Sequence, residues 1–266
     1  MSDSNLPDST ESSQTKNRAK GVYILPNLAT TSALFAGFYA IIASIQGNFI
    51  PAAMAIFAAQ ILDTLDGRIA RMTNTQSDFG AEYDSLSDCI SFGLAPALLA
   101  YQFALHSLDK FGWMVAFVYV AAGALRLARF NTQIGTTDKR YFIGLASPAA
   151  AAVIAGSVWL MSVYELKGED YAFYFAVGVA ASGILMVSNV RYFSFKVLGG
   201  ATGKMPFVWI PVFLLTFALI VSKPEYSLTI MSATYALSGV VFELYCLVLK
   251  LISKYKSKSD PEIESE

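Results

Sequence analysis

Charged residues are scarce in this chain. Asp, Glu, Lys and Arg make up 15% of its 266 residues, whereas a soluble domain carries about 25%. Because 55% of the residues are hydrophobic and the mean hydropathy is +0.49, this shortage excludes an ordinary water-soluble protein. Basic residues do not outnumber acidic ones, since the net charge is −1, and this excludes a generally basic surface for nucleic acid.

Histidine and cysteine are nearly absent. His106 is the only histidine and lies at the end of an apolar segment, so we expect a surface or interface role rather than catalysis or zinc binding. Cys89 and Cys246 lack metal-ligand spacing, and their apolar surroundings favour two small buried side chains over a disulfide or a reactive thiol. No basic segment followed by a short apolar one opens the chain, so no cleaved signal peptide is expected.

Long apolar runs dominate the sequence instead, and about 20 such residues cross a bilayer. We predict an all-α integral-membrane protein with about eight transmembrane helices, over residues 27–46, 50–70, 81–105, 111–130, 145–164, 170–188, 206–222 and 227–250. If the N-terminus is cytoplasmic, every Lys and Arg except Lys110, Lys167 and Lys223 lies on the cytoplasmic side. This asymmetry favours an even number of spans in the inner (cytoplasmic) membrane, with both termini cytoplasmic.

The chain has no tandem repeat and no second domain by its pattern. Residues 1–20 are polar and aperiodic, which predicts a disordered cytoplasmic tail. Residues 21–252 form the predicted transmembrane domain, and residues 253–266 a charged cytoplasmic tail.

Four aspartates lie in or beside strongly apolar sequence: Asp63 and Asp66 in the second predicted span, and Asp84 and Asp88 in the third. A carboxylate in hydrocarbon costs roughly 2.5–3.5 kcal/mol, and four of them together also repel. Spacings of three and four residues place each pair on one helix face, toward the cytoplasmic end. The pattern predicts a site for divalent cations that opens to the cytoplasm.

Small residues accompany these acids: Gly67 and Ala70 share the face of Asp63, and Gly80 lies one turn before Asp84. They favour close approach of a bulky ligand, although glycine and alanine also allow tight packing of membrane helices. Two other interpretations of the acids are open. They could line a cation pathway, although transport sites tend to lie near the midplane at broken helices, or form a structural cluster with Arg68 and Arg71.

The whole stretch has the pattern Asp63-x2-Asp66-Gly67-x2-Ala70-Arg71-x8-Gly80-x3-Asp84-x3-Asp88. It resembles the signature of the CDP-alcohol phosphatidyltransferases, complete at every fixed position. These enzymes move a phosphatidyl group from a CDP-linked lipid to an alcohol and release CMP. The resemblance implies a six-helix core, here with two additional helices, and a homodimer.

The same resemblance implies roles for individual residues. Asp63, Asp66, Asp84 and Asp88 would hold two ions of Mg²⁺ or Mn²⁺, and Asp88 would also be the general base. The nucleotide would contact a set from the first three spans: Asn27, Thr30, Asp66, Gly67, Ala70, Arg71 and Gly80. Asn27 and Thr30 could equally be helix caps.

Two later stretches, LRLARFN (125–131) and RYFIGLASPAAAA (140–152), resemble bacterial phosphatidylserine synthases of the integral-membrane type, with Ala146 where a proline is expected. This implies CDP-diacylglycerol and L-serine as substrates. Contacts to the acceptor or to a lipid phosphate are expected from Arg129, Asn131, Arg140 and Ser147. Basic residues are also expected there by the positive-inside rule alone, and choline, glycerol phosphate or inositol phosphate are alternative acceptors.

Overall fold

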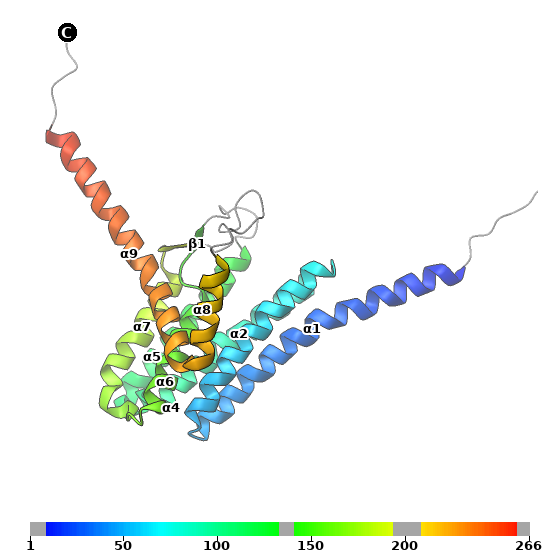
Figure 1. The fold of residues 1–266 in the computed structure, drawn as a ribbon, viewed down its shortest axis with the longest axis horizontal. Coiled ribbons are helices and arrows are strands. Elements are labelled where there is room, and N and C mark those ends of the chain that lie inside the picture. Colours follow the sequence, from blue (N-terminus) through cyan, green and yellow to red (C-terminus); the bar gives the residue numbers. More distant parts are fainter. Residues whose placement is uncertain (1–8, 133–140, 194–208, 260–266) are drawn as a thin grey trace, which may run out of the picture.

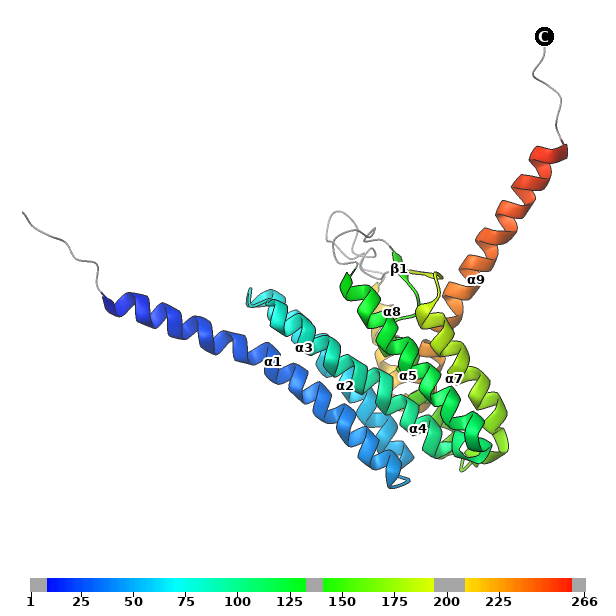
Figure 2. The ribbon, with the colours of Figure 1, turned by 180° about the vertical axis from the view of Figure 1, so that it is seen from behind.

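The computed structural model describes residues 9–132, 141–193 and 209–259, which are almost entirely helical (Figures 1 and 2). The long helices are α1 (Ser9–Ile45), α2 (Phe49–Met72), α5 (Asp109–Thr132), α6 (Ser147–Val163), α7 (Ala172–Val187), α8 (Trp209–Ser222) and α9 (Pro224–Ser259). Within these described ranges, five stretches are long and apolar enough to cross a bilayer: Pro26–Ile45, Phe49–Met72, Leu105–Thr132, Gly168–Val187 and Pro224–Lys250. The predicted all-α membrane architecture is confirmed.

The third predicted span is not one regular helix. It consists of α3 (Asp78–Asp88), a π-helical segment η1 (Cys89–Leu94) and α4 (Ala95–Phe103), which follow one another without a break in the chain. The hydrogen-bonding pattern of the predicted span 81–105 therefore changes immediately after Asp88. The fifth and seventh predicted spans are shorter helices, α6 with 17 residues and α8 with 14.

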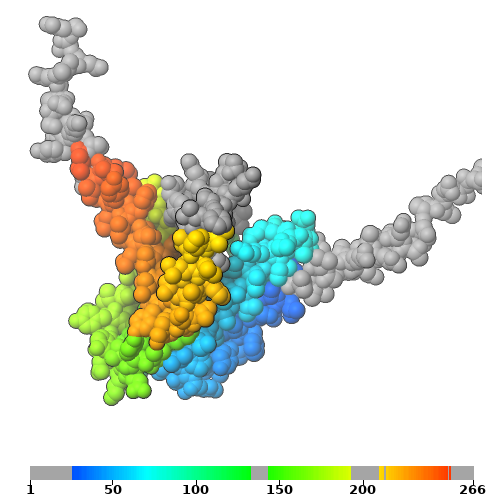
Figure 3. All heavy atoms as spheres, viewed as in Figure 1, coloured from blue at the N-terminus to red at the C-terminus, as the bar shows by residue number. Residues whose placement is uncertain are grey.

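Both end helices extend away from the bundle: the first half of α1 to one side and the second half of α9 to the other (Figure 1). Helix α1 begins at Ser9, within the segment that was expected to be a tail up to residue 20. Since Asn27 and Thr30 lie well inside this helix, they are not caps. On the face shown in Figure 3, α8 lies between α9 and α2.

Alanine dominates the packed interior. One core cluster joins α1, α2, α4 and α6 through residues such as Ala40, Ala52 and Ala155, all fully buried. A second cluster joins α4, α5, α6 and α7 around Tyr119 and Ile154. Apolar lipid gives helices little hydrophobic reason to associate, so small side chains that permit close backbone contact are the typical solution in membranes.

A two-stranded antiparallel sheet joins the loop before α6 to the loop after α7. Strand β1 (Tyr141–Ile143) pairs with β2 (Arg191–Phe193) in the register Phe142 to Tyr192. The Tyr192 hydroxyl donates to the Ala236 carbonyl of α9 over 3.1 Å, and burial raises the pKa of Tyr192 to about 12. Arg191 pairs with Glu243 at 3.5 Å, so β2 is fixed to α9 at two points.

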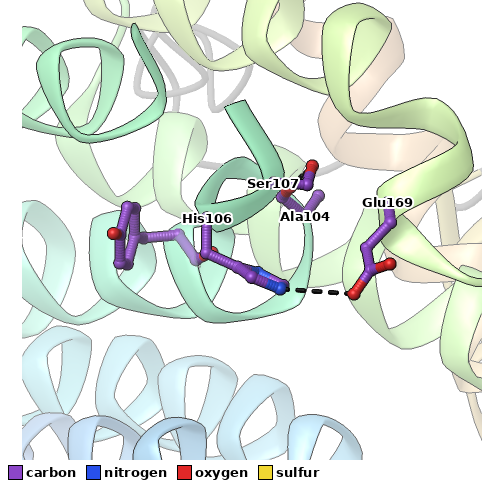
Figure 4. Close-up of polar contacts among 5 residues, drawn as sticks. Ala104, His106, Ser107 and Glu169 are labelled. Carbon is purple, nitrogen blue, oxygen red and sulfur yellow. Dashed lines mark hydrogen bonds and ion pairs between the residues drawn. The ribbon is translucent and has the colours of Figure 1, made fainter. Parts of the chain in front are cut away.

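The opposite end of the bundle is closed by two 3₁₀ turns, η2 (Leu105–Leu108) and η3 (Gly168–Tyr171). Figure 4 shows His106 pointing from η2 toward Glu169 of η3, with 3.3 Å between Nε2 and Oε1. The side chains of His106 and Glu169 are 42% and 61% exposed, which is consistent with the predicted surface role of His106. Cys89 and Cys246 are free, but both are partly exposed, so the prediction that they are buried was wrong.

Candidate active site between α2 and α3

Helix α2 presents the first acidic pair. Asp66 is 5% exposed and lies close to Thr30 of α1, while Asp63 is partly buried one turn earlier. The Cβ that Gly67 lacks would lie 3.8 Å from the Arg71 guanidinium, so the Arg71 side chain lies back along the same face. Ala70 is partly buried one turn after Asp66 on α2. This face is therefore acidic, with small side chains and one cation beside it.

Helix α3 begins where Ser77 caps it. Its hydroxyl accepts from the Gly80 N–H over 3.1 Å, which satisfies one of the free donors at a helix start. A Cβ on Gly80 would meet this hydroxyl at 3.2 Å and the Asn27 side-chain oxygen at 3.8 Å. Gly80 and Asn27, both predicted to contact nucleotide, are thus brought together from different helices.

A line of polar contacts fixes α3 against α1. The Tyr83 and Thr31 hydroxyls are 2.9 Å apart, and Ser87 donates to the Thr30 carbonyl over 3.3 Å. One turn further, Ser91 donates to the Ala33 carbonyl over 3.2 Å. These three contacts are spaced by four residues along α3 and η1, and Asp84 and Asp88 each follow one of them by a single residue. The adjacent face of α3, which carries Asp84 and Asp88, is therefore directed at α2.

The carboxylates converge as the spacing predicted. Asp63, Asp66 and Asp84 each offer an oxygen within 4.8 Å of the other two, and Asp88 lies close enough to Asp63 and Asp84 for their charges to interact. Among the described residues, one oxygen of Asp66 and one of Asp84 are buried without a hydrogen-bond partner. Such atoms are costly unless a cation binds them, and oxygen-only ligands suit Mg²⁺ and Mn²⁺. The donor set fits a divalent metal.

The π-helical segment is supported from α5. The Tyr119 hydroxyl donates to the Phe92 carbonyl over 3.1 Å, which satisfies one of the main-chain groups in this irregular region. A Cβ on Gly123 would be only 3.7 Å from the Gly93 Cα, so the two backbones approach closely there. π-Helical turns are rare and are frequently found at functional sites; this one begins directly after Asp88.

Arg126 is the site residue that the sequence did not single out. It follows Gly123 by one turn on α5, and its Nη1 donates to the Ser147 hydroxyl over 2.9 Å. It is close enough to Asp88 for the two charges to interact, and its buried Nε has no partner among the described residues. The available signal was an arginine within an apolar helix, where a charge is expensive.

The start of α6 is fixed beside the acidic cluster. Gln60, one turn before Asp63, donates to the Pro148 carbonyl over 2.8 Å, and Ser147 is 1% exposed under Arg126. Ser147 therefore lies against Arg126 at the start of α6, and its contact with the acceptor stays a prediction. Its position connects α2, α5 and α6 at the end of the bundle that carries the aspartates.

The other three residues predicted to contact the acceptor differ in where they lie. Asn131 lies 3.1 Å from the Ser85 hydroxyl, next to Asp84. Arg129 turns away from the acids toward α7, where its Nη2 donates to Asn189 over 2.8 Å and its Nη1 to the Val187 carbonyl over 3.4 Å. Arg140 lies outside the described residues.

A multi-pass membrane bundle with clustered carboxylates at one end defines an integral-membrane protein with a candidate metal centre. The chain belongs to the CDP-alcohol phosphatidyltransferase family, whose model matches residues 23–190. The match spans the acidic motif and extends to the end of the loop after α7.

Three curated relatives carry the same name, CDP-diacylglycerol–serine O-phosphatidyltransferase. The chain is 37% identical to the one from Helicobacter pylori strain 26695, over 89% of its own length and 98% of the relative's. It is 35% identical to the one from Methanocaldococcus jannaschii, over 70% and 81% of the two lengths. For the Bacillus subtilis protein the identity is 34%, over 65% and 91%.

Proposed function

We propose that this protein is a phosphatidylserine synthase, which transfers the phosphatidyl group of CDP-diacylglycerol to the hydroxyl of L-serine and releases CMP. The single observation that carries the proposal is the convergence of Asp63, Asp66 and Asp84 within 4.8 Å in a chain of this family. The names of the relatives support serine as the acceptor.

In this proposal Asp63, Asp66, Asp84 and Asp88 would hold two divalent ions, Mg²⁺ or Mn²⁺. Bound there, the metal would offset the negative charge of the CDP-lipid pyrophosphate. Gly67, Ala70 and Gly80 leave room for the nucleotide, and Asn27, Thr30 and Arg71 surround it. These assignments rest on the family pattern and on the way the residues gather around the cluster.

The reaction is a displacement at phosphorus. The serine hydroxyl oxygen forms a bond to the lipid-attached phosphorus, the bond from that phosphorus to the CMP oxygen breaks, and the hydroxyl proton passes to Asp88. Arg126, whose charge interacts with that of Asp88, would help to orient this carboxylate. We assign the acceptor contacts to Asn131, which donates to Ser85 next to Asp84, and to Ser147, which accepts from Arg126.

The proposal also covers the membrane, the orientation and the oligomeric state of the enzyme. Residues 21–252 form its catalytic domain in the inner (cytoplasmic) membrane, both tails and the acidic cluster face the cytoplasm, and the chain works as a homodimer. The distribution of Lys and Arg supports the orientation. Cysteine substitutions in loops at the two ends of the bundle, treated with a membrane-impermeant thiol reagent, test it.

CMP release from CDP-diacylglycerol by the purified protein in detergent, with Mn²⁺ or Mg²⁺ and with or without L-serine, tests the activity. We expect CMP only when both metal and serine are present. Choline, glycerol phosphate and inositol phosphate in parallel reactions identify a different acceptor. Metal flux into liposomes without consumption of CDP-lipid would instead support a transporter and contradict the proposal.

Asp84→Asn is the decisive variant for the metal role. Removal of a group that only orients metal ligands typically costs 10–100-fold, so loss of a direct ligand is expected to lower CMP release by about 100-fold or more. Asp170→Asn, an exposed acid in η3 at the other end of the bundle, is the matched control and should retain activity. Wild-type rates in the Asp84 variant would remove the proposed mechanism.

A further inference from the structure

An apolar groove of about 460 Å³ runs between α5 and α7, within two membrane-spanning helices. Its floor consists of small buried residues, Ala122 and Gly183, and its walls of large exposed ones, among them Phe117, Leu125 and Ile184. In a bilayer such a groove is filled by lipid acyl chains rather than by water.

Close approach of the two helices creates this floor. A Cβ on Gly183 would lie 3.3 Å from the Tyr119 Cα and 3.6 Å from the Ala122 Cβ. Since α7 rests directly on the α5 backbone here, the large side chains on either side stand above a depression. Figure 2 shows α5 and α7 side by side along their length.

A positive charge lies at one mouth of the groove. Arg129 is one turn beyond Leu125 on the same side of α5, and it donates to the carbonyl of Val187, which lines the groove. Among the described residues it has no carboxylate partner, and its two hydrogen bonds go to neutral oxygens. A guanidinium in this state suits a phosphate, which it can bind through two N–H groups.

We propose that this groove is a binding site for an anionic glycerophospholipid of the surrounding bilayer, with an acyl chain along α5 and α7 and its phosphate at Arg129. The site is separate from the acidic cluster, because Arg126 and Arg129 leave α5 toward different helices, α6 and α7. The groove provides length and apolar contact, and Arg129 provides the preference for negative charge.

Photo-crosslinking of the full chain in phosphatidylcholine vesicles tests the proposal. The probe is phosphatidylglycerol with a diazirine in one acyl chain, and labelled peptides are mapped by mass spectrometry. We expect adducts in residues 117–125 and 183–188. They should exceed those from the same probe with a phosphatidylcholine headgroup by about fivefold, the effect of one arginine near an anionic headgroup.

Substitutions at Ala121 and Arg129 test the apolar groove and the positive charge separately, each with a control variant. Ala121→Phe places a ring inside the groove and should abolish the adducts, whereas Ala218→Phe adds the same ring on the exposed surface of α8 and should leave them. Arg129→Gln should remove the headgroup preference, and Arg129→Lys should retain it because the charge is kept.

Three outcomes would overturn the proposal. Adducts that persist in Ala121→Phe would mean that the lipid lies elsewhere. Displacement of the probe by CDP-diacylglycerol would assign the groove to the substrate's own chain. Crosslinks from α5 or α7 to a second copy of the protein would make the groove a dimer interface. CMP release measured on the same samples reports separately on the proposed activity.

Discussion

Inside the bundle, the guanidinium of Arg126 interacts with the carboxylate of Asp88. Arg126 is mostly buried, donates to Ser147, and interacts electrostatically with Asp88. A buried charge whose partner is removed is strongly destabilising, by about 3–5 kcal/mol, whereas loss of both partners is often close to neutral. Substitutions at Arg126 and Asp88 should therefore have non-additive effects on stability as well as on activity.

Arg126→Met is expected to lower the melting temperature of the purified protein, because the charge of Asp88 is then left without its cation. Asp88→Asn combined with Arg126→Met should recover most of that loss, since the uncompensated charge is removed as well. Thermal unfolding in detergent, followed for both single variants and the double variant, measures the coupling. Strictly additive shifts would show that the two residues do not interact.

Sequence reasoning found the four aspartates because two strong patterns coincide on them, hydropathy and the spacing of three and four residues. It named Arg129 as an acceptor or lipid-phosphate contact and did not single out Arg126. Both lie in LRLARFN, and the positive-inside rule explains either one equally well. Only packing shows that the first faces Ser147 and the second faces Asn189.

At the scale of elements, α1 crosses the π-helical segment that begins directly after Asp88. Gly37 of α1 lies directly against Ser91, where an added Cβ would come within 2.8 Å of the Ser91 Cα. The obstacle is backbone, which cannot rotate aside as the end of a flexible side chain can. The distance from α1 to η1 is therefore set by the absence of a side chain at residue 37.

Gly37→Ala should push α1 and η1 apart next to Asp88 and cost about 1–3 kcal/mol, the usual range for overpacking. We expect CMP release to fall more than the amount of folded protein. Gly178→Ala on α7 is the matched control, because nothing lies within 4 Å of its added Cβ. Equal activity of the two variants would show that this crossing does not position Asp88.

The π-helical segment itself was beyond sequence reasoning. Cys89–Leu94 has no proline and no unusual composition, and the shift in hydrogen bonding depends on partners that come from elsewhere. Tyr119 satisfies the Phe92 carbonyl and Ser91 is held by Ala33 of α1. The pairing of β1 with β2 is likewise tertiary, since the two strands are three residues each and lie on either side of α6 and α7.

For the whole molecule, the acidic cluster couples stability to metal. Asp63 and Asp66 come from α2 and Asp84 from α3, and their carboxylates lie within 4.8 Å. Without a cation, their mutual repulsion opposes the packing of the two helices. A ligand that binds only the folded state raises the free energy of unfolding, and the increase grows with the logarithm of the ligand concentration. At a concentration one hundred times the dissociation constant, the increase is about 2.7 kcal/mol.

EDTA is therefore expected to lower the melting temperature of the purified protein, and Mn²⁺ or Mg²⁺ to restore it, by several degrees at a hundredfold excess over the dissociation constant. Asp63→Asn combined with Asp84→Asn should melt higher than the wild type in EDTA, since repulsion is relieved, and should no longer respond to metal. Asp170→Asn, far from the cluster in η3, should respond as the wild type does. If metal still raises the melting temperature of the double variant, the cation binds elsewhere in the protein, because the variant lacks the carboxylates of Asp63 on α2 and Asp84 on α3.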